Sequence, residues 1–123
     1  MRRKFIAGNW KMNKTLAETR LLLDELVPLL SPLDGIDRAV CPPYSALQLA
    51  AEMLTGTGIS VGAQNMHWEE SGAFTGELSP AMIAELCQYV IVGHSERRQY
   101  FGESDVNVNR KVKAALAQGI IPI

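Results

Sequence analysis

Short apolar runs alternate along the chain with longer segments of helical period. The runs are bounded by Gly, Pro or Asn and are mostly continuous in hydrophobicity, which is typical of parallel strands covered on both faces. They predict strands at residues 4–7, 38–41, 59–63, 89–92 and 120–123. The strand starts lie on average 29 residues apart between residues 4 and 120, about the size of a βα repeat. The alternation therefore predicts an α/β fold.

The segments between the runs predict helices at residues 15–30, 45–54, 79–86 and 104–119. Apolar residues at helical spacing mark one buried face on each of the first and last helices, and these faces are expected to include Leu29 and Leu116. Every predicted helix begins at a capping signal. The signals are Thr15 with Glu18, Ser45 with Gln48, Ser79 with Pro80, and Ser104 or Asp105.

Two architectures accept four strand–helix units followed by a fifth strand: an open doubly wound sheet, and part of a (β/α)8 barrel. No G-x-G-x-x-G follows the first strand, which disfavours the commonest dinucleotide-binding open sheet. A complete barrel needs about 250 residues, and the chain has 123. In either architecture we expect residues 1–123 to form one domain.

Charge and composition narrow the function classes. The 12 Lys and Arg nearly balance the 13 Asp and Glu, so no global basic field is available for a nucleic acid or an anionic membrane. There is no apolar run of roughly 18 residues and no secretory signal, and we expect a cytoplasmic protein. Cys41 and Cys87 have no disulfide or metal-ligand pattern and are predicted to be buried, inert thiols.

The first candidate for chemistry follows the first strand. Strand alternation would place Asn9 and Lys11 on one side and Trp10 on the other, so an amide and an ammonium would point together at an oxygen-rich anion. The plainer interpretation makes Lys11 a solvated loop residue and Asn9 a turn residue.

The second candidate follows the fourth strand. A short helix is predicted to begin at Ser95, which leaves His94 at its N-terminus, where the helix dipole disfavours an imidazolium. A neutral imidazole can polarise a substrate carbonyl. Glu96 is expected to pair with Arg97, with Arg98, or with Lys11 across the strand ends, whereas the plainer interpretation has His94 only capping a helix. Both candidates lie at the carboxyl ends of strands, where α/β enzymes carry their sites.

Four separated motifs resemble the triosephosphate isomerase family. They are AGNWKMN at 7–13, QN…SGAFTGE at 64–77, GHSERR at 93–98 and FGESD at 101–105, and the resemblance covers the whole chain with the family's spacing. It implies half of a (β/α)8 TIM barrel, made of four βα units plus a strand. It also implies a glycolytic enzyme that interconverts dihydroxyacetone phosphate and glyceraldehyde 3-phosphate through an enediolate, with no cofactor or metal and usually as a homodimer.

The resemblance also assigns roles to single residues. Asn9 resembles the family's substrate-contacting asparagine and Lys11 its essential cation. His94 resembles the electrophilic histidine, and Glu96 the glutamate that organises the lysine and the histidine. A neutral histidine at a helix N-terminus is already the family's arrangement, so the dipole argument above is not independent of it. The segment Phe74, Thr75 and Gly76 resembles the tip of the dimer loop; from the residues alone, that loop is only an exposed polar excursion.

The chain departs from the family pattern by ending as the fifth strand begins. The family's general-base glutamate, its lid and its phosphate-binding loops belong to the part that is absent, and no other carboxylate here lies in a motif that would replace the base. We therefore expect the isolated chain to be inactive. It should pair with a second copy, pair with a C-terminal half, or remain loosely packed. The alternative is a non-catalytic half-barrel module for folding or assembly, natural or engineered.

Overall fold

The computed structural model describes residues 2–123, which form a five-stranded parallel sheet in the order β1-β2-β3-β4-β5. This is the predicted (β/α)4-plus-strand half of a (β/α)8 barrel. The elements in chain order are β1 (Lys4–Asn9), α1 (Leu16–Leu30), β2 (Ile36–Cys41), the 3-10 turn η1 (Tyr44–Ala46), α2 (Leu47–Leu54), β3 (Ile59–Ala63), α3 (Pro80–Leu86), β4 (Tyr89–Val90), α4 (Ser95–Tyr100), α5 (Asp105–Ala117) and β5 (Ile121–Pro122).

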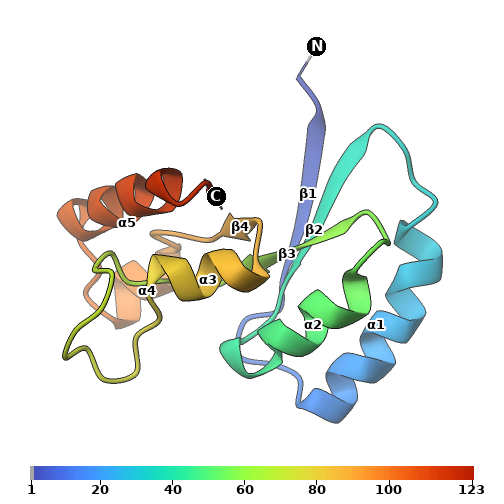
Figure 1. The fold of residues 1–123 in the computed structure, drawn as a ribbon, viewed down its shortest axis with the longest axis horizontal. Coiled ribbons are helices and arrows are strands. Elements are labelled where there is room, and N and C mark those ends of the chain that lie inside the picture. The colour runs from blue at the N-terminus through green and yellow to red at the C-terminus, as the bar shows by residue number, and fades with distance from the viewer. Residues whose placement is uncertain (1) are drawn as a thin grey trace.

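The core lies where the helices cover the sheet. In Figure 1, α1 and α2 lie together to the right of β1 and β2, and α3, α4 and α5 gather at the left, near β4. Burial of apolar surface here is the main source of stability, at about 25 cal/mol per Å². The fully or nearly fully buried members include Leu23, Val40, Leu47, Val61, Met66, Ile83, Val90 and Ala115.

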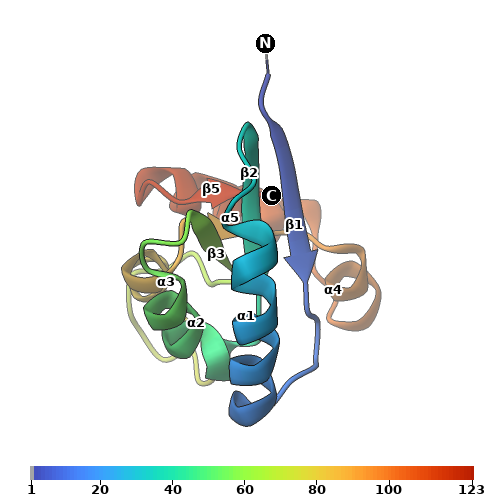
Figure 2. The same ribbon diagram turned by 90° about the vertical axis from the view of Figure 1, so that its right-hand side faces the viewer.

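The first strand differs from the expectation that both strand faces are covered. Its residues from Lys4 to Gly8 are exposed, and Ile6 is 62% exposed. The amino end of β1 extends beyond the helices in both ribbon views (Figures 1 and 2), so helices cover little of its surface. Phe5 is partly covered because its ring stacks on Tyr89, with centroids 4.6 Å apart.

The last two strands are shorter than the predicted runs 89–92 and 120–123. β4 and β5 pair only through Tyr89 with Ile121 and Val90 with Pro122. Main-chain bonding nevertheless continues past them, because the Ile91 N–H donates to the Ala63 carbonyl at 2.8 Å and the Val92 N–H donates to the Ile123 carbonyl at 3.1 Å. In both predicted runs, main-chain hydrogen bonds to neighbouring strands therefore continue beyond the two residues that have regular strand geometry.

Three of the four capping signals are confirmed. Thr15 forms the full capping box with Glu18, Ser79 accepts from the Met82 N–H, and Ser104 accepts from the Asn107 N–H. Within residues 2–123, no helix has the length and apolar character that crossing a bilayer requires.

The capping box predicted at Ser45 is wrong. Ser45 lies inside the turn η1, α2 begins later at Leu47, and neither element has a side-chain cap. Pro43 begins this turn with an extended ψ of 159°, so the chain enters the 3-10 turn before the serine is reached. Leu29 and Leu116, expected on buried helix faces, are 68% and 61% exposed.

Thr15, which caps a helix, and Ser45, which does not, allow a matched test of capping. Replacing Thr15→Ala removes the hydroxyl that accepts from the Glu18 N–H, although the main-chain N–H at position 15 can still donate to Glu18 Oε1, and should lower the free energy of unfolding by about 1 kcal/mol. Ser45→Ala removes no cap and should change it by less than about 0.5 kcal/mol. Urea unfolding of the two variants beside the wild type measures both values. Equal destabilisation by the two substitutions would contradict the observed capping.

Candidate active site

A cavity of about 490 Å³ opens at the carboxyl ends of the strands. Asn9 ends β1, Gln64 follows β3, and His94 and Glu96 follow β4. Parallel strands carry their carboxyl ends at one edge, so segments far apart in sequence meet here. The cavity is lined by Asn9, Lys11, Met12, Pro43, Tyr44, Gln64, Asn65, Gly76, Glu77, His94, Glu96, Arg97 and Phe101.

Asn9 and Lys11 do converge on this cavity, but strand alternation is not the reason. The strand ends at Asn9, whose Oδ1 accepts a hydrogen bond from the Lys11 N–H at 2.9 Å. Lys11 has a φ of 55°, a left-handed conformation that is uncommon for a lysine. Gln64 holds it there, since its Nε2 donates to the Lys11 carbonyl at 2.9 Å and to the Cys41 carbonyl at 2.8 Å. A side-chain-supported turn therefore aims Lys11.

Of the three partners considered for Glu96, the structure selects Lys11. The Lys11 Nζ lies 2.6 Å from Glu96 Oε1 and joins the first βα unit to the fourth. The hydrogen bond from Lys11 holds the pKa of the Glu96 carboxyl below its usual value; burial opposes this effect, and the charge of Lys11 adds to it. Glu96 is therefore a carboxylate that is already engaged by a cation.

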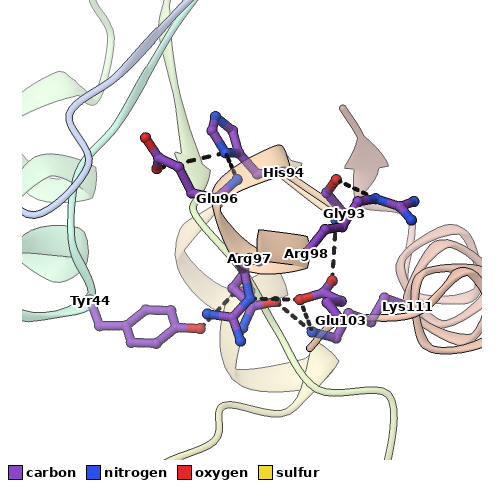
Figure 3. Close-up of polar contacts among 9 residues, drawn as sticks. Tyr44, Gly93, His94, Glu96, Arg97, Arg98, Glu103 and Lys111 are labelled. Carbon is purple, nitrogen blue, oxygen red and sulfur yellow. Dashed lines mark hydrogen bonds and ion pairs between the residues drawn. The ribbon is translucent and has the colours of Figure 1, made fainter. Parts of the chain in front are cut away.

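His94 is the N-cap of α4, as expected. Its Nδ1 accepts a hydrogen bond from the Glu96 N–H at 3.1 Å (Figure 3). An acceptor nitrogen carries no proton, so in this arrangement the proton of the neutral ring lies on Nε2. His94 thus has a hydrogen-bond donor available to a molecule in the cavity.

Behind the cavity lies a buried ionic cluster that the sequence did not predict. Glu103 Oε2 lies 2.6 Å from Arg97 Nε and 3.3 Å from Lys111 Nζ. Lys111 also donates to Asn65 Oδ1 at 2.7 Å, and the Tyr44 hydroxyl donates to the Asn65 carbonyl at 3.0 Å. Glu103 and Lys111 are 8% and 5% exposed. One feature of the sequence could have indicated the cluster. Lys111 lies between Val108 and Val112 on the predicted apolar face of the last helix, where a charged residue needs a partner.

Burial and pairing act in opposite directions on the pKa values of Glu103 and Lys111: pairing prevails at Glu103 and burial prevails at Lys111, so both pKa values are lowered. Burial raises the pKa of Glu103, but the hydrogen bond from Arg97 and the charge of Lys111 outweigh it, so the net pKa is lowered. Burial lowers the pKa of Lys111, and Glu103 opposes that change. Arg97 and Arg98, considered above as partners of Glu96, pair instead with Glu103 and Asp105.

The long loop at residues 64–78 carries an aromatic stack. The His67 ring lies with its centroid 4.2 Å from both Trp68 and Phe74, and Arg110 of α5 lies 5.4 Å from the Trp68 ring centroid. Of the three residues predicted at the loop tip, Gly76 lines the cavity, whereas Phe74 and Thr75 are exposed and do not. Their expected contact with a neighbouring subunit stays a prediction.

The two thiols are buried, as expected. Burial raises the pKa of Cys41 to about 11 and that of Cys87 to about 12, so both remain protonated and unreactive near neutral pH. In the described part of the chain, no group of three or more His, Cys, Asp or Glu side chains is placed to hold a metal ion.

Comparisons with known proteins agree on one family. The family model of triosephosphate isomerase matches residues 4–123. Triosephosphate isomerase from Carboxydothermus hydrogenoformans is 55% identical over 100% of this chain and 49% of its own length. That of Clostridium botulinum is 56% identical over 100% of this chain and 50% of its own length. The crystal structure of triosephosphate isomerase from Bartonella henselae has a TM-score of 0.84 at 38% identity, over 98% of this chain and 50% of that one. The chain spans about half the length of the curated relatives that it matches.

The buried carboxylate predicts an acid-dependent stability. Because the pKa of Glu103 is lowered from 4.5 on folding, its ionised form stabilises the fold above pH 4.5, and this stabilisation is lost as the pH falls through the lowered value. Glu103→Gln should lower the free energy of unfolding at pH 7 by about 3 kcal/mol, because two cations lose their counter-charge. It should also flatten the decline of stability below pH 4.5.

Urea unfolding at several pH values measures both effects, with the exposed Glu25→Gln as the matched control, which should change stability by less than about 0.5 kcal/mol. The lowered pKa values of Glu18 and Glu96 act equally in wild type and variant, so they cancel in the difference. An unchanged acid slope in Glu103→Gln would contradict the role given to Glu103.

Proposed function

Because the chain belongs to the triosephosphate isomerase family, we propose that it supplies the cationic and electrophilic half of an active site that interconverts dihydroxyacetone phosphate and glyceraldehyde 3-phosphate, a cytoplasmic step of glycolysis. The observation that carries the proposal is the convergence of Asn9, Lys11, His94 and Glu96 on one cavity.

Each group has a distinct task in this proposal. The Nε2–H of His94 donates to the substrate carbonyl and stabilises the enediolate oxygen. The Lys11 ammonium compensates the negative charge of the substrate and of the enediolate, while the Asn9 side chain contacts the substrate. Glu96 orients Lys11 through the 2.6 Å ion pair and orients His94 through its main-chain N–H. These groups lower the barrier to enolisation only when a base removes the carbon-bound proton.

The cavity offers no well-suited base among the described residues. Its two lining carboxylates are Glu96 and Glu77. The lowered pKa of Glu96 and its pairing with Lys11 make it a weak proton acceptor. Glu77 lies on the loop at 64–78, outside any motif that resembles the family's base. Loss of a general base costs about 10²–10⁴ in rate. We therefore propose that the 123-residue chain alone has negligible isomerase activity.

The exposed sheet supports the proposal that a partner completes the fold. Ile6 of β1 and Ile121 of β5 are 62% and 53% exposed, and both strands have only one neighbour in the sheet. Unpaired strand edges and exposed apolar side chains favour association. We propose that the chain pairs with a C-terminal half or with a second copy, with the loop tip at Phe74, Thr75 and Gly76 facing a neighbouring subunit. The same exposed edges favour the second candidate function, a non-catalytic half-barrel assembly module.

A complementation assay separates the two candidate functions. The purified chain should show no triose phosphate turnover in a coupled assay, and addition of a separately expressed C-terminal half of the Carboxydothermus hydrogenoformans relative should restore it. In the same mixture, His94→Gln should lower the restored rate by about 10²-fold or more. The exposed Gln48→Ala on α2 serves as the control and should leave it unchanged. Turnover at an ordinary rate by the chain alone, or no turnover in any mixture, would contradict the proposal.

Sedimentation equilibrium tests the association. The chain alone is expected to sediment above its monomer mass of 13.5 kDa, and in the presence of the C-terminal half it should form a mixed species. A compact monomer that unfolds cooperatively and does not bind the C-terminal half would contradict both forms of association.

A further inference from the structure

Gly93, the residue before His94, is held on both sides by side chains. Its N–H donates to Glu103 Oε1 at 3.2 Å, and its carbonyl accepts from Arg98 Nε at 3.1 Å (Figure 3). The N–H belongs to the peptide before Gly93 and the carbonyl to the peptide shared with His94. The two hydrogen bonds therefore fix both peptide planes that flank the glycine.

A glycine needs this restraint more than any other residue. Gly93 has a φ of +66°, and a Cβ built on it would lie 2.8 Å from Val108 Cγ2 of α5. The close approach of α5 and the positive φ require glycine, yet glycine is the residue with the greatest backbone freedom. Any rotation about its φ or ψ would swing the His94 imidazole relative to the cavity.

One restraining side chain comes from the segment between α4 and α5, and the other is anchored to the first residue of α5. Glu103 lies in this segment and is fixed by Arg97 and Lys111. Arg98 passes from the Gly93 carbonyl to Asp105, with its Nη1 2.6 Å from Asp105 Oδ1. The motif FGESD at 101–105, to which the family resemblance assigned no task, contains both carboxylates.

We infer that Glu103 and Arg98 are positioning residues that lock the Gly93 backbone and thereby orient His94, with Asp105 holding Arg98 in place. The importance of this orientation for the isomerisation rests on the proposed function. The lock itself does not, because it is a property of the folded chain without substrate. Neither residue touches the reacting atoms in this scheme.

The lock on Gly93 has a buried arm, Glu103, and an exposed arm, Arg98 with Asp105. The Glu103 side chain is 3% exposed, so its removal disturbs the whole cluster. The side chains of Arg98 and Asp105 are 42% and 92% exposed, and an exposed ion pair adds little to global stability. Substitutions of Arg98 and Asp105 can therefore change the position of His94 without unfolding the chain.

NMR of the isotope-labelled chain tests the exposed arm. The sequence has only two histidines, so the ring nitrogens of His94 are assigned by comparison with His67→Gln. In the wild type, His94 should be the single Nε2–H tautomer. In Arg98→Ala the ring should become a mixture of tautomers, and the Glu96 amide, which donates to His94 Nδ1, should exchange with solvent roughly two- to tenfold faster.

Matched variants separate positioning from stability. Arg20→Ala, on the exposed surface of α1, should alter neither signal. Asp105→Ala should reproduce part of the Arg98→Ala effect, and Asp105→Asn, which keeps an acceptor oxygen, should restore the wild-type signals. Unchanged His94 signals in Arg98→Ala would overturn the Arg98 arm. Faster exchange at all amides, in proportion to a lower unfolding midpoint, would show a general loss of stability and would also overturn the positioning role of Arg98.

The buried arm is tested on the wild-type chain, so that misfolding of a Glu103 variant does not intervene. The Gly93 amide, bonded to a carboxylate, should exchange at least about tenfold more slowly than the amide of Gly102, an exposed glycine of the same segment. Equal exchange at the two glycines would overturn the Glu103 arm. Neither measurement involves turnover, so an intact lock with no complemented activity would contradict only the proposed function.

Discussion

A carboxylate removed from water must be compensated by cations and hydrogen-bond donors, and Glu103 obtains this compensation from three places in the chain. Arg97 comes from α4, Lys111 from α5, and the Gly93 N–H from the turn after β4. Each of these partners is also connected to the cavity. Arg97 lines it, Lys111 donates a hydrogen bond to Asn65, and Gly93 precedes His94. The arrangement behind the cavity therefore follows from satisfying one buried charge.

The cavity itself depends on parallel strand order. Because β1 to β5 pair in sequence, the turn after β1 and the turn after β4 share one edge of the sheet, and the Lys11–Glu96 ion pair can close the distance between them. Local devices then set each side chain: an asparagine-supported turn with a positive φ for Lys11, and a main-chain donor for His94. Sheet topology brings the groups together, and local hydrogen bonds orient them.

The sequence predicted the strand–helix rhythm, three caps and the four groups that meet at the cavity, because these are recorded in local patterns. The sequence-based predictions were wrong where the structure of a residue depends on its neighbours in the chain or in space. Ser45 has the composition of a cap, yet the preceding Pro43 starts a turn too early for it. Leu116 lies at a position of the predicted apolar face, yet it is exposed. α5 buries Lys111 instead, because the carboxylate of Glu103 pairs with its ammonium. The partners of Glu103 lie on two different helices, α4 and α5, so the pairing follows no helical repeat and is established only when the two helices pack together.

The aromatic stack on the loop at residues 64–78 has an optical consequence. The Trp68 ring stacks on the His67 imidazole and also faces the Arg110 guanidinium, while the only other tryptophan, Trp10, packs against the apolar core. We therefore expect the indole emission of Trp68 to respond to two polar neighbours, one from its own loop and one from α5. Fluorescence from that single side chain reports whether the loop is seated on the helix, and fluorescence from Trp10 reports the integrity of the interior.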